Sequence, residues 1–229
     1  MKTIGLIGGM SWESTIPYYS IINEYVKDTL GGFHSARIVL YSVDFAEIER
    51  CQSEGDWDKS AEILAEAAFR LEKAGADIIL ICTNTMHKVY PKVRAALNVP
   101  MLHIAEATGE ELAKRGIKKV ALLGTRYTMQ EDFYKFKLIE MGFEVIIPKD
   151  NDITLVNNVI FNELCFGQIK DDSRNEFARI INELKNDGAE AVILGCTEIG
   201  LLVKQEDSVL PVFDTTVIHA EKAAEWALK

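Results

Sequence analysis

Two stretches of the sequence occur twice, and this repetition constrains the fold more than any other feature. Residues 75–81 match residues 188–194 at an offset of 113, with a glycine, an apolar strand-like run and an acidic residue at equivalent places. Residues 2–8 match residues 118–124 at an offset of 116. A repeat this long that contains several elements indicates a duplicated structural unit. We therefore expect two similar domains.

Short apolar, β-branched segments alternate with longer amphipathic ones along the whole chain. This alternation is typical of a mainly parallel sheet covered by helices on both faces, so the fold class is α/β. The predicted strands span 3–7, 36–42, 77–82, 101–103, 119–123, 144–147, 191–195 and 209–213. The predicted helices span 14–30, 59–74, 88–97, 106–115, 130–141, 153–166, 173–186 and 216–228.

The repeat also predicts where the domains meet. The first domain should contain residues 1–98 and 209–229, and the second should contain residues 99–208, with the boundary near Asn98-Val99-Pro100. Residues from 209 onward fit neither copy of the repeat, so we expect them to return to the first domain. In paired α/β domains a ligand binds at the carboxyl ends of the strands, in the cleft.

The charge balance argues against several kinds of partner. The chain has 35 acidic and 25 basic side chains, a net charge of −10, and no basic patch with interleaved aromatic residues, which argues against nucleic acid and anionic membranes. No apolar run approaches the roughly 18 residues of a membrane span. The cysteines lack paired spacing and no leader pattern opens the chain, which predicts a cytoplasmic protein.

No cofactor or metal motif is present. The glycine turn at residues 5–9 lacks the Gly-x-Gly-x-x-Gly spacing of dinucleotide sites, and there is no phosphate-binding Gly-Lys-Ser/Thr loop. His34, His103 and His219 share no metal-like spacing with acids or cysteines. We therefore predict neither a cofactor nor a metal.

Each repeated strand ends in a small polar cluster, and these clusters are the candidate chemistry. The offset of 113 pairs Thr83 with Cys196, Asn84 with Thr197 and Thr85 with Glu198. Related by a pseudo-twofold axis, such positions would flank one substrate, which suits racemisation or epimerisation. Backbone N–H groups at a strand-to-helix junction can bind a carboxylate, and the helix dipole there should lower the pKa of Cys196.

The sequence resembles the aspartate/glutamate racemase family in three places: Gly-Leu-Ile-Gly-Gly-Met at 5–10, Thr-Asn-Thr-Met-His at 83–87 and Leu-Gly-Cys-Thr-Glu-Ile at 194–199. The resemblance implies two Rossmann-like domains and a racemase that uses two opposed cysteines, without pyridoxal phosphate. Cys196 matches the second cysteine. Thr83 stands where the family has the first, and the repeat independently places it there.

This departure implies an asymmetric reaction. A threonine hydroxyl ionises roughly 7 pKa units above a cysteine thiol, so Thr83 cannot serve as an ordinary general base. In the family the second cysteine removes the proton of the L-substrate. The resemblance therefore implies that Cys196 abstracts the α-proton of L-aspartate or L-glutamate. Cys82 is expected to face the opposite side from Thr83 and to pack in the core.

The remaining candidates would bind the small-molecule amino-acid substrate. Family resemblance suggests that the loop after the second strand reads the distal carboxylate, with Gln52 preferred over Arg50. His87 is expected on a helix surface or beside the anion site. The predicted substrate-binding residues are Met10, Gln52, Asn84, Thr85, Thr125, Thr197 and Glu198.

Two alternatives stay open. The change from cysteine to Thr83 is also compatible with a non-catalytic protein that binds a carboxylate or an amino acid. A racemase for other amino acids, neutral ones included, fits the same motifs, because Cys165 lies where some aspartate-specific relatives have a basic residue. A homodimer is expected from the family resemblance.

Overall fold

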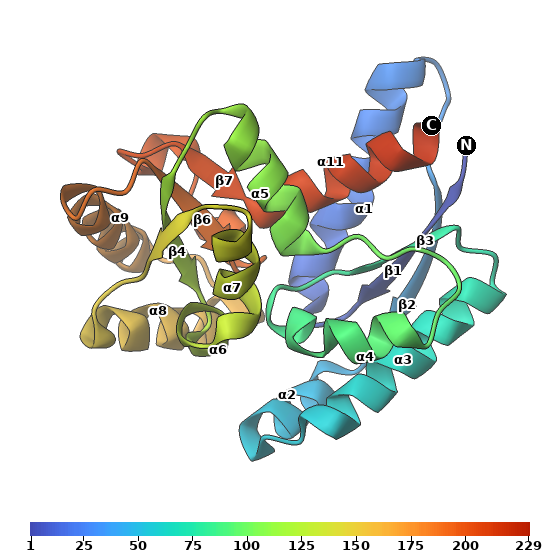
Figure 1. Cartoon of the computed structure of the whole chain (residues 1–229), viewed down its shortest axis with the longest axis horizontal. Helices are drawn as coiled ribbons and strands as arrows, with labels where there is room; N and C mark the ends of the chain where they lie inside the picture. The colour runs from blue at the N-terminus through green and yellow to red at the C-terminus, as the bar shows by residue number, and fades with distance from the viewer. The chain divides into compact units, whose positions relative to one another are not determined.

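The computed structural model describes residues 1–229, and its strands form two separate parallel sheets, one in each of two units. The first unit comprises residues 1–104 and 219–229, and the second comprises residues 105–218 (Figure 1). The α/β fold class with parallel sheets is therefore confirmed.

The first sheet has the strand order β2-β1-β3, and all its pairings are parallel. Its strands are β1 (Thr3–Gly8), β2 (Arg37–Ser42) and β3 (Ile78–Ile81). The helices of the first unit are α1 (Trp12–Leu30), α2 (Phe45–Glu54), α3 (Trp57–Lys73), the short 3-10 helix η1 (Thr85–Val89), α4 (Tyr90–Ala95) and the part of α11 (Thr215–Leu228) from residue 219 onward.

Alternation along β3 explains why helices cover both faces of this sheet. Ile79 and Ile81 belong to a core cluster that includes Leu64 and Leu71 of α3, and Ile78 and Leu80 belong to a second cluster with residues of α1 and α11. Successive side chains of a strand point to opposite faces, so a strand buried on both faces is apolar throughout. Each fully buried Ile or Leu stabilises the fold by roughly 1.5–3 kcal/mol.

The second sheet has the order β5-β4-β6-β7, again fully parallel. Its strands are β4 (Lys119–Gly124), β5 (Glu144–Ile146), β6 (Ala191–Gly195) and β7 (Val212–Asp214). The helices of the second unit are α5 (Ile104–Lys114), α6 (Arg126–Gln130), α7 (Asp132–Glu140), α8 (Asp150–Asn162), η2 (Leu164–Phe166), α9 (Asp171–Asn186), α10 (Ile199–Leu202) and η3 (Gln205–Asp207).

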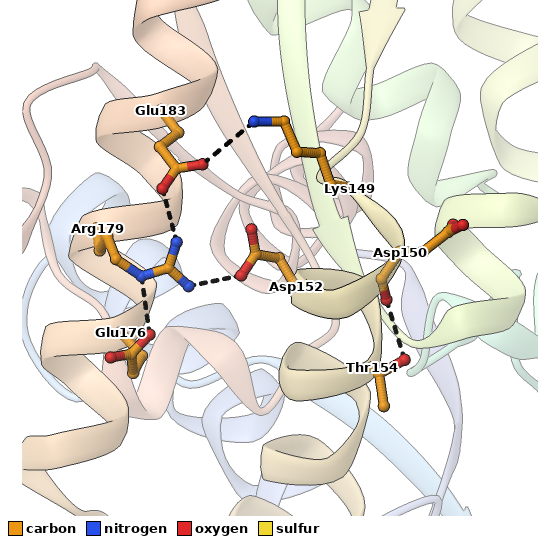
Figure 2. A network of polar contacts seen from close by, with 7 residues as sticks. All are labelled: Lys149, Asp150, Asp152, Thr154, Glu176, Arg179 and Glu183. Atoms are coloured by element: carbon orange, nitrogen blue, oxygen red, sulfur yellow. Dashed lines mark hydrogen bonds and ion pairs between the residues drawn. The ribbon is translucent and has the colours of Figure 1, made fainter.

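Helices α8 and α9 are joined at the surface by a polar network around Arg179 (Figure 2). The guanidinium of Arg179 contacts Asp152 of α8 at 2.5 Å and Glu176 and Glu183 of its own helix at 2.9 and 2.7 Å. Lys149, which precedes α8, reaches Glu183 at 3.8 Å. Exposed ion pairs contribute little individually, so this network orients the two helices while their buried apolar faces supply most of the stability.

The internal repeat is reproduced in three dimensions. β1 lies between β2 and β3 just as its counterpart β4 lies between β5 and β6. The equivalent acidic residues also act alike, because Asp77 accepts the backbone N–H of Thr3 at 2.6 Å and Glu190 accepts that of Lys119 at 3.0 Å. The duplication thus extends to the hydrogen bonds that hold the strand starts.

The structure corrects the predicted position at which the chain returns to the first domain. Val212–Asp214 pairs with β6 in the second sheet, and only residues from 219 onward belong to the first unit. The predicted division at 208/209 is therefore about ten residues too early, because β7 extends the second sheet by one strand that the first sheet lacks. The other end of the second unit begins at residue 105 rather than 99.

Three local predictions also differ from the structure. Residues 101–103 form no strand, only an isolated bridge between Met101 and Ile79. The segment after β2, expected as a loop, is the helix α2, with Asp44 as its N-cap and Gly55 in a left-handed C-cap. Helix α7 matches the predicted helix 130–141, but the short helix α6 that precedes it, at Arg126–Gln130, was not predicted. No helix is both long enough and apolar enough to traverse a lipid bilayer.

Candidate active site

In the first unit, the candidate residues gather where β1 and β3 end. These strands are parallel neighbours, so Gly9-Met10 after β1 and Thr83-Asn84-Thr85 after β3 lie at the same edge of the sheet. Gly9 has φ of +88°, and a Cβ there would approach Val43 O to 2.3 Å. Only glycine fits this turn, which leaves its N–H to donate to Thr15 Oγ1 at 2.9 Å.

The backbone at Thr83 is held by a buried histidine. His87 Nε2 accepts the N–H of Ile104 at 3.2 Å, so its Nδ1 carries the proton and donates to Thr83 O at 2.8 Å. His87 is only 2% exposed, so the expected helix-surface role is wrong. The signal that could have revealed it is the separation of four residues between Thr83 and His87, which allows a side chain to return to the carbonyl one turn earlier.

His87 belongs to a cluster of three buried histidine rings. Its centroid lies 4.6 Å from that of His103 and 5.9 Å from that of His219. His219 Nδ1 accepts from Tyr18 Oη at 2.9 Å, which leaves Nε2 to donate to Leu102 O at 3.1 Å. Burial lowers the pKa of His87 well below its usual value and that of His219 to about 3. Both rings are therefore neutral at pH 7.

Acid should destabilise the protein through His219. Its pKa is about 3 when folded and about 6.5 when unfolded, so the unfolded state binds more protons and stability falls as pH drops from about 6.5 toward 3. We expect a loss of about 2 kcal/mol between pH 7 and pH 5 from this residue. His219→Gln should remove that increment, as measured by urea unfolding at both pH values. An equal pH dependence in the variant would contradict this assignment.

The predicted substrate readers Met10 and Gln52 are both buried in the first unit. Gln52 lies on α2, and its Nε2 donates to Met86 Sδ at 3.0 Å. Met10 and Met86 belong to the same apolar core cluster. Arg50, the other candidate in this segment, is exposed.

In the second unit, Thr125 and Cys196 follow β4 and β6. These strands are parallel neighbours whose last paired residues are Gly124 and Gly195, so both side chains lie at the same sheet edge. Thr125 caps α6, accepting the N–H of Thr128 at 3.3 Å. Asn84 and Thr85 in the first unit, like Thr197 and Glu198 here, are at most 5% exposed.

The surroundings of Cys196 differ from those expected. Its Sγ donates to Glu198 Oε2 at 2.9 Å, and Thr197 Oγ1 donates to the same oxygen at 3.0 Å. Burial, followed by the charge of Glu198, raises the pKa of Cys196 well above its usual range. The expected lowering is therefore wrong, because burial and the nearby carboxylate of Glu198 both disfavour the thiolate.

Comparisons with known proteins give the family. The model of the family described as Asp/Glu/Hydantoin racemase matches residues 7–223. The chain belongs to the Asp/Glu/hydantoin racemase family. It is an isomerase of the amino-acid racemase type, as the resemblance implied.

Individual relatives agree with this assignment. The racemase is 27% identical over 225 residues to the broad specificity amino-acid racemase RacX of Bacillus subtilis, covering 95% of each chain. Among solved structures, a candidate Asp/Glu racemase from Yersinia pestis is 54% identical with a TM-score of 0.93, and an aspartate racemase homologue from Pyrococcus horikoshii is 41% identical with a TM-score of 0.87. Both structures cover all of this chain and are themselves covered completely.

The other cysteines of this racemase are placed for packing. Cys82 follows β3, is fully buried and belongs to the core cluster of Ile4 and Leu6, and burial raises the pKa of its thiol. Its predicted burial in the core is thus confirmed. Cys51 is buried on α2, Cys165 is half-buried on η2, and all four cysteines are free thiols. No group of three or more His, Cys, Asp or Glu side chains is placed to hold a metal ion.

Proposed function

We propose that this racemase acts on small acidic amino acids, aspartate and glutamate. Cys196 abstracts the α-proton of the L-enantiomer, and Thr83 stands in the place of the usual opposing cysteine. The observation that carries this proposal is the buried Cys196 thiol at the end of β6, with a carboxylate acceptor 2.9 Å from Sγ. A thiolate is the base that α-proton removal needs, and a site shielded from water strengthens it.

The reaction should be asymmetric between the two enantiomers. Thr83 is at the repeat position of Cys196, but its hydroxyl ionises roughly 7 pKa units above a thiol, which is about 10 kcal/mol of free energy. Thr83 can hydrogen-bond the substrate or relay a proton to the carbanion, but it cannot abstract one efficiently. The L-enantiomer is therefore the preferred substrate, and the D-enantiomer is the product.

The remaining site residues would hold the substrate. Asn84 and Thr85 supply polar groups at the end of β3, and Thr125 and Thr197 supply them at the ends of β4 and β6. Each is fixed by burial, which lowers the entropic cost of binding a small anion. Met10 follows β1 and Gln52 lies on helix α2, and in this proposal these two residues bind the distal carboxylate of the substrate.

Two alternatives make different predictions. A protein that binds a carboxylate without turnover is favoured by the replacement of a catalytic cysteine with Thr83. A racemase for other amino acids is favoured by the similarity to RacX, whose name describes broad specificity. The first alternative predicts binding without α-proton exchange, and the second predicts exchange on neutral amino acids.

Solvent exchange is the direct test of the proposed function. L- and D-aspartate and L- and D-glutamate are incubated separately with the protein in D2O without added cofactor, and the Cα–H signal is followed by proton NMR together with optical rotation. We expect faster exchange from the L-enantiomers, accompanied by inversion. Comparable initial rates from both enantiomers would contradict the asymmetric mechanism, and no exchange on any of the four would favour a binding protein or another substrate.

We propose a cytoplasmic location and a homodimeric assembly for this racemase. Four free thiols, three of them buried, are typical of a reducing compartment such as the cytoplasm. A homodimer is supported by the exposed apolar side chains of Trp12, Ile16 and Tyr19 on α1 beside Leu40 of the edge strand β2. An apolar surface of this kind is typical of a protein–protein contact. Analytical ultracentrifugation would measure the assembly state.

A further inference from the structure

The carbonyl of Thr83 lies beyond the hydrogen-bonded part of β3. The strand ends at Ile81, and Cys82 N still donates to Ile7 O of the neighbouring strand at 2.9 Å. Thr83 O instead accepts from Nδ1 of His87, four residues later, at 2.8 Å. The Thr83 backbone, and with it the direction in which its side chain leaves the chain, is therefore held by a side chain and not by the sheet.

The imidazole of His87 is fixed at both of its nitrogens. Nε2 accepts the N–H of Ile104 at 3.2 Å, and Nδ1 donates to Thr83 O. The other neutral tautomer would bring two donors together at Ile104 and leave Thr83 O without its donor, and a charged ring could not accept from Ile104. Only the neutral ring with its proton on Nδ1 makes both bonds.

The backbone segment that bonds Nε2 is itself anchored to three other elements. Leu102 N donates to Ile79 O of β3 at 3.3 Å. Tyr90 Oη of α4 donates to Met101 O at 3.0 Å. His219 Nε2 of α11 donates to Leu102 O at 3.1 Å. This segment therefore gives the His87 ring a fixed reference point inside the first unit.

We propose that His87 is a positioning residue for the proposed reaction, and that its Nδ1–H tautomer holds the Thr83 hydroxyl where it can deliver a proton to the carbanion. His87 is only 2% exposed and acts through Thr83. This inference rests on the proposed function of Cys196 and Thr83. It assigns His87 to one half of the reaction, because Cys196 forms the carbanion and Thr83 protonates it on the other face.

The proton transfers balance. The sulfur of Cys196 takes the α-proton of the L-substrate, and the C–H electron pair stays on the carbanion. The Thr83 hydroxyl gives its proton to the carbanion and recovers one from water, and Cys196 returns its proton to solvent. When Thr83 is misplaced, Cys196 exchanges its proton with D2O and returns deuterium to the same face. The ratio of inversion to exchange therefore reports on Thr83 alone.

Two variants separate the two hydrogen bonds of the ring. An asparagine side chain has an N–H donor near the place of Nδ1 but does not reach Ile104, whereas a glutamine has an acceptor near the place of Nε2 but loses the donor to Thr83 O. With L-aspartate in D2O, we expect the ratio of inversion to exchange to fall at least about tenfold in His87→Gln. In His87→Asn the ratio should stay within about threefold of the wild-type ratio.

A histidine that only supports the fold would give a different result. Loss of either hydrogen bond would then lower the amount of folded protein, so exchange and inversion would fall by the same factor and their ratio would not change. An unchanged ratio in His87→Gln, or a larger fall in His87→Asn than in His87→Gln, would overturn the inference. Proton NMR and optical rotation on the same sample measure both rates.

The tautomer can be tested without substrate and without a variant. The titratable groups packed against His87 are His103, Tyr90 and His219, with ring centroids 4.6, 5.7 and 5.9 Å away. Burial, and after it His103, lowers the pKa of His87 well below its usual value. In NMR spectra of isotope-labelled histidine side chains, we expect the His87 proton on Nδ1 throughout the range from about pH 6 to 8.

These outcomes separate the inference from the proposed function. A His87 ring with its proton on Nε2, or one that titrates near about pH 6.5, would overturn the inference even where both variants fail to fold. Absent exchange on all four amino acids by the wild-type protein would refute the proposed function, whereas exchange with an unchanged ratio in His87→Gln would refute only the role of His87.

Discussion

We expect Cys196→Ser to lower the rate of α-proton exchange of L-aspartate or L-glutamate in D2O by about a thousandfold or more. The serine hydroxyl ionises far above a thiol, so at neutral pH it does not supply the base that α-proton removal needs. This substitution leaves unchanged the substrate contacts proposed for Asn84, Thr85 and Thr125. Binding measured by isothermal titration calorimetry should therefore change much less than the exchange rate.

Cys82→Ala is the matched control for this variant. Cys82 is a free thiol at the end of the repeat-equivalent strand β3, but it is fully buried in the core cluster of Ile4 and Leu6. Its replacement should lower the free energy of unfolding by about 1 kcal/mol and leave exchange within a few-fold of wild type. If Cys82→Ala lost exchange while Cys196→Ser kept it, the assignment of Cys196 as the base would be wrong.

We expect Thr83→Cys to raise the exchange rate of the D-enantiomers by roughly a hundredfold or more, which would bring the D-rate closer to the L-rate. The substitution replaces a hydroxyl by a thiol of similar size at the position equivalent to Cys196. His87 already fixes the backbone there, by its hydrogen bond of 2.8 Å to Thr83 O. The backbone that would carry the new thiol is therefore already fixed. Initial rates from D-aspartate and D-glutamate in D2O measure the change.

Thr83→Ser is the control for this second variant. It keeps a hydroxyl of nearly unchanged pKa, so it should show no gain with the D-enantiomers. A gain of equal size in Thr83→Ser would show that space, and not the acidity of the side chain, limits the D-direction. An unchanged D-rate in Thr83→Cys would contradict the proposal that Thr83 is a weaker acid–base group than Cys196.

Much of the fold is predictable from the sequence because its signals are local. Strands such as Ala191–Gly195 are continuous apolar runs with turn residues at their ends, and helices such as Asp171–Asn186 show helical periodicity. The wrong predictions concern segments whose local signals are weak. The strand predicted at 209–213 is present as β7, but it was assigned to the first domain, whereas it pairs with β6 in the second sheet. The polar segment of α2 was expected as a loop, and capping by Asp44 and Gly55 decides that it is a helix.

The candidate site, too, is predictable from the sequence only in part. Repeat alignment alone places Thr83 and Cys196 at equivalent strand ends, because the carboxyl end of a parallel strand is fixed by the order of elements along the chain. The four-residue separation of Thr83 and His87 permits the buried hydrogen bond of His87 but does not require it, and nothing in the sequence shows that the pKa of Cys196 is raised. Both depend on distances to other groups, Ile104 N for His87 and the Glu198 carboxylate for Cys196.

The sequence by itself determined the duplicated α/β plan, the strand ends that carry the polar clusters and membership of the racemase family through the motifs at 5–10, 83–87 and 194–199. The tertiary structure alone decided where the chain returns to the first unit, which side chains are buried and which protonation states they hold. The physical reason is the separation along the chain over which each property is determined. Periodicity depends on residues that are neighbours in the sequence, whereas burial and pKa depend on atoms that folding brings to within a few ångströms.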